Sequence, residues 1–173
     1  LTTFYLIILT LAIALPFGIL TAIYLNEIAK KNKFNNLLRS LIDMLTGIPS
    51  IIYGLMGAAL FVPLSMGVFN TQGGSLISGA LTLTIIVLPV IIKATEEALI
   101  VVPRAYKEAS YALGANMTQT VFKVILPNAL PGIISATLLS IGRIIGESAA
   151  LIYAIGTAIK DDISIFDKGT SLA

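Results

Sequence analysis

The sequence contains no cysteine and no histidine. Disulfides, Cys or His nucleophiles and zinc sites built from those two ligands are therefore excluded. Charge is also scarce, because Asp, Glu, Lys and Arg make up 12% of the 173 residues, against about 25% in soluble domains. The formal net charge of +2 is too small to indicate nucleic acid as a partner.

Apolar residues dominate what remains, at 57% of the chain and a mean hydropathy of +0.96. Charge is missing from residues 4–25 and again from residues 44–92. About 20 apolar residues cross a bilayer, so the first run predicts one membrane span and the second predicts two. A turn between those two is predicted at residues 70–75, where Gly and small polar residues gather. The expected spans are Phe4–Leu25, Leu41–Val62 and Leu76–Ala98, followed by a fourth helix from about Pro131 to Gly156, with Pro131 in its first turn.

Basic residues predict the orientation of these spans. The connection after the first span contains four of them, the connection after the third contains four, and the turn between spans two and three contains none. Lys and Arg collect on the cytoplasmic side, so the segment around residues 104–123 is expected inside and both chain ends outside. The chain begins at Leu1 without a cleavable signal, and we expect it to be a fragment of a longer protein.

The longest polar segment lies between the third and fourth apolar stretches. Good helix formers from Arg104 to Leu113 predict a short helix, with Gly114 just past its end. A second short helix is expected from Asn116, as N-cap, to about Val124, ending before Pro127. Two short helices joined at a glycine would form a compact knob. Spacing alone is equally compatible with an ordinary amphipathic loop.

Two charges interrupt the fourth apolar stretch, Arg143 and Glu147. Arg143 is expected near the bilayer centre, where a charge costs about 2.5–3.5 kcal/mol. One interpretation is an i,i+4 pair along one helix face that neutralises itself, with Gly142 and Gly146 serving close helix packing. The other is a pathway in which the planar guanidinium of Arg143 binds an anion and Glu147 holds the guanidinium when the cavity is empty. A partner subunit is then expected to add positive charge.

Three other features are weaker candidates. Asp43 and Arg39, four residues apart, are expected to form an interfacial ion pair. Glu96 is expected, with its neighbour Glu97, to cap or solvate the inner end of the third span. The Gly47–Ser50 segment is either a simple kink or a broken helix that lines a cavity.

The polar segment resembles a known signature. Glu-Ala-Ala, three residues, Gly, nine residues, Ile, one residue and Leu-Pro mark the permease subunits of binding-protein-dependent ABC importers. The sequence departs from this pattern at Ser110, in place of the second Ala, and at Val124, in place of the Ile. The residues that match are Glu108, Ala109, Gly114, Leu126 and Pro127.

The resemblance implies an all-α polytopic membrane protein with the type I ABC importer permease fold. Residues 1–173 would form one permease domain, and the loop at about 96–127 would contain the coupling helix that docks in a groove of a cytoplasmic ATPase. Such permeases have six spans, so the four found here imply that one is missing at each end.

Further phrases resemble permeases of phosphate importers. Residues 142–149 are similar to their Gly-Arg-Ala-x-Gly-Glu-Thr run, with Ser148 in place of Thr, and residues 22–27 and 47–55 resemble the PstA-type subunit. This resemblance implies import of inorganic phosphate by alternating access across the cytoplasmic (inner) membrane of a prokaryote, with Arg143 and Glu147 on the pathway. The implied partners are a cytoplasmic ATPase dimer, a second permease subunit of PstC type, an extracytoplasmic phosphate-binding protein and the lipid bilayer.

The chain itself is not expected to be an enzyme or to hold a cofactor. It lacks a GxxxxGK[ST] phosphate loop, so ATP and Mg²⁺ would bind to the partner ATPase. Sulfate, molybdate or another small solute remains an alternative cargo. A stand-alone secondary transporter or channel is a further alternative, which co-purification of an ATPase and strict ATP dependence would exclude.

Overall fold

The computed structural model describes residues 2–29, 32–69 and 74–155, and within these ranges the secondary structure is entirely helical. Four helical stretches are long and apolar enough to cross a membrane: Thr3–Ile28, Ser50–Val68, Leu76–Val101 and Met117–Gly146. The elements in chain order are α1 Thr2–Ile23, the π-helical turn η1 Tyr24–Ile28, α2 Lys33–Thr46, α3 Ser50–Phe69, α4 Leu76–Val101, α5 Arg104–Ala112, α6 Met117–Thr120, the π-helical turn η2 Val121–Ile125, α7 Leu126–Gly146 and α8 Ser148–Ile155.

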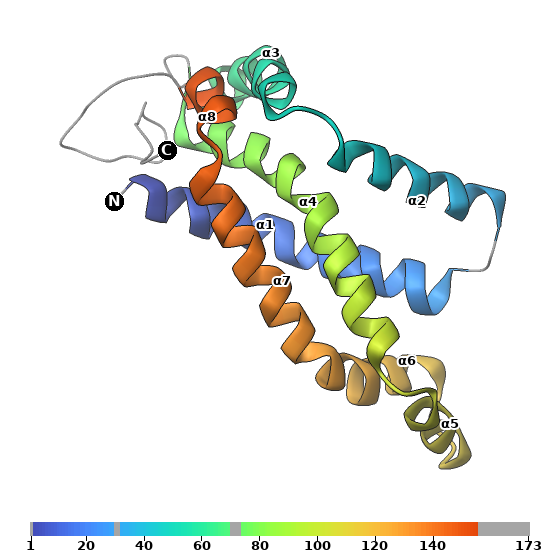
Figure 1. Cartoon of the computed structure of the whole chain (residues 1–173). Coiled ribbons are helices and arrows are strands. Elements are labelled where there is room, and N and C mark those ends of the chain that lie inside the picture. The colour runs from blue at the N-terminus through green and yellow to red at the C-terminus, as the bar shows by residue number, and fades with distance from the viewer. Residues whose placement is uncertain (1, 30–31, 70–73, 156–173) are drawn as a thin grey trace.

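Helix α4 is the central element and packs against both α1 and α7 (Figure 1). Small side chains at every fourth position of α1 let it approach α4 closely. At one of them, Gly18, a Cβ atom would overlap with the side chain of Ile91 in α4. The other small residues of this buried stripe are Thr10, Ala14 and Ala22. The predicted first and third spans are thereby confirmed as the packed pair α1 and α4.

Two apolar clusters divide the bundle along its length. The outer cluster joins α1, α3, α4, α7 and α8, and includes Leu6, Leu83 and Ile144. The inner cluster joins α1, η1, α4, η2 and α7, and includes Leu99 and Ile125. Helices α5 and α6 project beyond the inner cluster, at the end of the molecule opposite to α8 and the N-terminus (Figure 1).

The second span differs from its predicted bounds. The span is α3, and the hydrophobic residues before it belong to the amphipathic helix α2, which ends at Thr46. Gly47 is the C-cap of α2, and Pro49 disfavours the helical conformation in Ile48, the residue before it, so the helix does not continue into α3. The apolar face of α2 is exposed at Phe34, Leu37, Leu41 and Met44. The predicted turn at 70–75 lies mostly outside the described residues.

The fourth span also differs. Helix continues without interruption from Met117 through η2 to Gly146, so neither Pro127 nor Pro131 begins or ends it. Pro127 is tolerated because the wide turn of η2 precedes it, where the Leu126 N–H bonds the Val121 carbonyl five residues back. The helix ends instead at Glu147 (φ −90°, ψ 76°), after which α8 begins. The predicted single helix from Pro131 to Gly156 is therefore wrong.

Candidate functional site

Residues 104–125 form the compact knob that the sequence predicts. Helix α5 ends at Ala112, and Gly114 has a φ of +82°, a conformation that glycine adopts readily. Asn116 is the N-cap of α6 as predicted, because its side-chain oxygen accepts from the Gln119 N–H at 2.8 Å and the Gln119 side chain accepts from the Asn116 N–H at 3.0 Å. Both local helix signals in this segment are thus confirmed.

A buried hydrogen bond joins α5 and α6, which are the two legs of the knob. The hydroxyls of Ser110 in α5 and Thr120 in α6 lie 2.8 Å apart, and both residues are buried. Ser110 is the position at which the sequence departs from the importer signature. The polar substitution therefore has its own partner in this chain, a pairing that no local pattern indicates.

The outer surface of the knob is exposed and partly apolar. Glu108, Ala109 and Gly114 are all exposed, and the Leu113 side chain beside them is 89% exposed. A hollow of about 450 Å³ opens between α5 and the base of α7. It is lined by Tyr106, Ala109, Ser110, Leu113, Ala115, Val124 and Asn128. The knob offers a protein partner both a protruding leucine and a recess.

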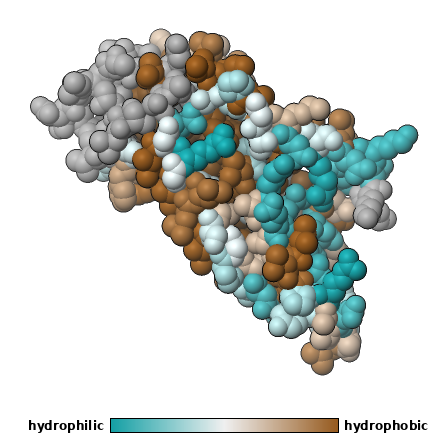
Figure 2. Space-filling view, viewed as in Figure 1, coloured by the Kyte–Doolittle hydropathy of each residue, from teal (hydrophilic) through white to brown (hydrophobic). Residues whose placement is uncertain are grey.

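The remaining two signature residues lie at the base of the knob. Leu126 is half-buried and Pro127 is exposed at the start of α7. The structure thus gathers Glu108, Ala109 and Gly114 on the projecting part and places Leu126 and Pro127 where the knob joins the membrane helix. Hydrophilic residues gather over the half of the molecule that holds α2, α5 and α6 (Figure 2).

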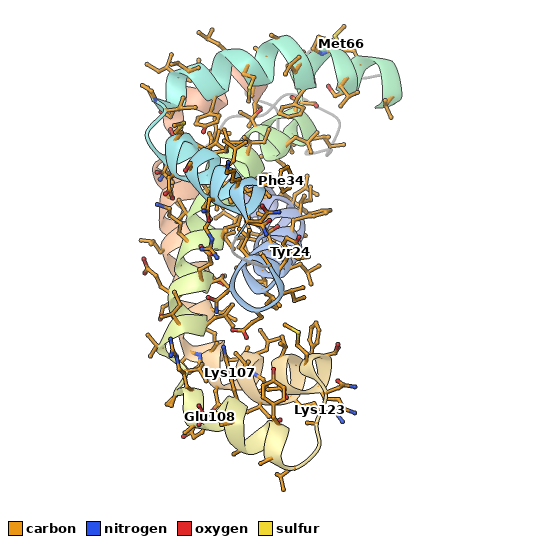
Figure 3. All side chains as sticks on the ribbon, turned by 90° about the vertical axis from the view of Figure 1, so that its right-hand side faces the viewer. Tyr24, Phe34, Met66, Lys107, Glu108 and Lys123 are labelled. Atoms are coloured by element: carbon orange, nitrogen blue, oxygen red, sulfur yellow. The ribbon has the colours of Figure 1, made fainter. Side chains whose placement is uncertain are left out.

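An ion pair links the knob to the end of the first span. Lys107 Nζ lies 2.7 Å from Glu27 Oε1, which also accepts from Asn26 Nδ2 at 2.8 Å. The Glu27 side chain is 6% exposed. Figure 3 shows Lys107 where α5 faces the rest of the molecule, with Glu108 and Lys123 at the sides of the knob.

Arg143 is half-buried in the last turn of α7, far from the helix midpoint expected for it. Because α7 ends at Gly146, Glu147 lies in the bend and the two residues do not share one helix face. Among the residues that the structure describes, no ion pair joins them. The interpretation of the two residues as a self-neutralising i,i+4 pair is therefore wrong.

The residue after Arg143, Ile144, is buried in the outer cluster together with Tyr53 of α3. The Tyr53 hydroxyl donates to the main-chain oxygen of Leu45 at 2.7 Å, across the Gly47–Ser50 bend. Ile144, which follows Arg143, thus packs in the same cluster as the tyrosine that spans the bend between α2 and α3.

Two ion pairs fasten α2 to α4. Arg39 Nη1 lies 2.7 Å from Glu96 Oε1, and Lys93 Nζ lies 2.6 Å from Asp43 Oδ1. The expected pair of Arg39 with Asp43 is therefore wrong, because each finds an opposite charge on the neighbouring helix. Glu96 likewise pairs with a residue of another helix, Arg39 of α2, and does not act as the helix cap that was one of its expected roles. Sequence spacing along one helix cannot reveal such partners.

The described residues provide no obvious metal site. Within 2–29, 32–69 and 74–155, no three acidic side chains gather closely enough to hold a metal ion.

The fold is that of a type I ABC importer permease, with the projecting knob at one end of an all-helical bundle. Residues 14–169 match the family described as binding-protein-dependent transport system inner membrane component. The chain belongs to this family of membrane proteins.

Named relatives cover most of the chain. A probable ABC transporter permease, YqgI of Bacillus subtilis, is 39% identical over 154 residues, which is 89% of this chain and 51% of the relative. The phosphate transport system permease PstA homolog of Mycoplasma pneumoniae is 38% identical over 171 residues, 98% of this chain and 26% of the relative. PstA 1 of Mycobacterium tuberculosis is 37% identical over 155 residues, 89% and 49% of the two chains. The chain therefore spans about half the length, or less, of these relatives.

Solved structures show the same fold. The MetNI methionine ABC transporter, in inward-facing conformations, gives a TM-score of 0.67 at 29% identity over 86% of this chain and 67% of that one. An amino acid ABC transporter with histidines gives a TM-score of 0.65 at 18% identity, over 87% and 67% of the two chains. At that identity the second likeness concerns the fold alone.

Proposed function

We propose that this chain is part of the permease subunit of an ATP-driven importer of inorganic phosphate in the cytoplasmic membrane of a prokaryote. The observation that supports this most is the projecting knob, which presents Glu108, Ala109 and Gly114 of the importer signature on an exposed surface. Family membership across residues 14–169 supports it independently. The knob would dock on a cytoplasmic ATPase, with Leu113 entering a groove of that partner.

Phosphate is the proposed cargo for two reasons. Relatives such as the PstA proteins are named as phosphate permeases and align with most of the chain. Arg143, moreover, is half-buried and makes no ion pair with a described carboxylate. A guanidinium in such a place presents a planar set of donors that fits phosphate oxygens.

One guanidinium does not balance a doubly charged anion. A second permease subunit of PstC type would add positive charge across the passage, and an extracytoplasmic phosphate-binding protein would deliver the anion. Glu147, at the bend after α7, is proposed to line the same passage. The anion site must bind phosphate more tightly in the outward-open state than in the inward-open state for delivery to proceed.

The proposed cycle assigns ATP chemistry to the partner. ATP and Mg²⁺ would bind to the ATPase dimer, whose closure moves the knob and thereby the helices attached to it. The residues of this chain position the anion and transmit the movement, and no cofactor of its own is proposed.

The test is uptake by the complete transporter, with the whole permease chain, its partner subunits and the binding protein reconstituted in vesicles. Radiolabelled phosphate should accumulate with ATP and not with a non-hydrolysable analogue. Uptake without ATPase subunits would instead indicate a secondary transporter or channel. An excess of sulfate or molybdate that abolishes uptake would reassign the cargo within the same class.

A carboxylate cargo is the second candidate, because the MetNI neighbour is a methionine transporter with a TM-score of 0.67. An α-carboxylate could bind the same guanidinium fork. Competition with methionine in the same uptake assay separates the two cargos.

A further inference from the structure

The knob is built as a rigid body. Its two legs are held together by the Ser110–Thr120 hydrogen bond, and the capping pair Asn116 and Gln119 fixes the start of its second leg. A force on the knob therefore moves its two helices together. The knob does not adjoin the first span in the sequence, so this movement reaches the first span through contacts in space.

The end of the first span is shaped to reach the knob. The buried stripe of α1 repeats every four residues up to Ala22, and an unbroken α-helix would continue it at Asn26. The π turn η1 contains about one extra residue per turn. The next position of the buried stripe is therefore occupied by Glu27 and not by Asn26. Glu27 is thereby turned inward, where its carboxylate meets Lys107.

The same π turn connects the first span to α2. The Ala29 N–H bonds the Tyr24 carbonyl at 2.7 Å, so it does not serve the Leu25 carbonyl four residues back. The Leu25 carbonyl accepts from Arg39 Nη2 at 2.5 Å instead. Arg39 in turn pairs with Glu96 of α4. The backbone of η1 thus connects two sets of polar contacts, one with the knob and one with α2 and α4.

We propose that the Lys107–Glu27 ion pair is a strut that couples movement of the knob to the first span and stays closed throughout the transport cycle. The inference rests on the proposed function and adds two positioning residues to it. Apolar side chains of the inner cluster can slide past one another without losing much contact. The ion pair is directional, and its carboxylate is only 6% exposed, so it holds Lys107 of the knob at one position relative to the first span. Neither residue belongs to the importer signature or to the expected anion pathway.

The first experiment neutralises each end of the strut in the complete transporter. Lys107→Met and Glu27→Gln should lower phosphate transported per ATP hydrolysed by about tenfold, within the range of coupling energies between sites. Basal ATPase activity and co-purification of the ATPase should be retained. The double reversal Glu27→Lys with Lys107→Glu should restore most of the ratio. Lys33→Met, which removes an exposed basic residue at the start of α2, outside the knob, is the matched control and should leave the ratio unchanged.

The second experiment holds the strut closed. Cysteines replacing Glu27 and Lys107 are joined by a short bifunctional methanethiosulfonate reagent, which dithiothreitol reverses. The proposal expects transport in the joined form to exceed that of the open double-cysteine form. Loss of transport on joining, with recovery on reduction, would overturn it, as would an unchanged transport ratio in Lys107→Met.

These outcomes are distinct from failure of the proposed function. If phosphate is not the cargo, the unaltered transporter takes up none, and ATP hydrolysis stimulated by the binding protein replaces uptake as the measure of coupling. Lys107→Met should then reduce that stimulation while Lys33→Met preserves it. Equal stimulation in both variants would overturn the proposal.

Discussion

The hydroxyls of Ser110 and Thr120 lie 2.8 Å apart in a buried position and join the two helices of the knob. The importer signature has alanine at the position of Ser110, so this chain adds a polar contact where the pattern has a methyl group. A buried hydroxyl that loses its partner is destabilising, whereas removing both partners is nearly neutral.

Ser110→Ala is therefore expected to destabilise the knob by about 1–3 kcal/mol, because the Thr120 hydroxyl loses this partner. Ser110→Ala combined with Thr120→Val, which keeps the shape of Thr120, should come close to the unaltered protein. Hydrogen exchange of the backbone amides of residues 104–125 in the complete transporter measures both. Equal exchange in the single and double variants would contradict the expectation.

Gly114→Ala is expected to destabilise the knob by about 1–2 kcal/mol, the cost of a left-handed conformation for a residue with a Cβ atom. A Cβ at Gly114 would meet nothing within 4 Å, so the cost is one of backbone conformation alone. Gly67→Ala is the matched control, because its Cβ would also meet nothing and it lies inside α3. The thermal midpoint should fall for Gly114→Ala and not for Gly67→Ala.

Gly132→Ala tests the contact between α4 and α7. The added Cβ would overlap with the Ala98 side chain, and such overpacking costs about 1–3 kcal/mol. Combining it with Ala98→Gly exchanges the two side chains across the contact and should recover much of the loss. Thermal unfolding in detergent measures the three proteins, and a double variant no better than Gly132→Ala would exclude this contact as the cause.

Arg143→Gln is expected to lower phosphate uptake by about tenfold to a hundredfold, the worth of charge-assisted hydrogen bonds to one anion. Arg143→Lys should retain part of the activity, because it keeps the charge and loses the planar fork. Lys33→Gln removes an exposed charge at the start of α2 and is the control for net charge. Uptake that is unchanged in Arg143→Gln would refute the role proposed for this residue.

Local signals account for what the sequence predicted well. Gly114 and Asn116 act through their own backbone and neighbours, so the end of α5 and the start of α6 follow from sequence. The apolar stretches of α1 and α4 are long and free of charge over most of their length, which makes membrane spans hard to miss.

Contacts between distant segments account for the rest. The partners of Arg39 and Asp43 lie on α4, and the partner of Glu27 lies 80 residues away on α5. The π turns η1 and η2 have no simple local sequence signal, yet they decide which way Glu27 faces and how Pro127 is accommodated in the helix. The bend at Glu147 was missed because the residues around it remain apolar, although Gly146 is a common residue at a helix end.

The uninterrupted helix from Met117 to Gly146 has a mechanical consequence. At about 1.5 Å per residue its 30 residues measure roughly 45 Å. The second leg of the knob lies at one end of this lever, and Arg143 lies in the last turn at the other. Arg143 lies 26 residues from Met117, so a tilt of only ~10° about the knob end would carry its position sideways by ~7 Å.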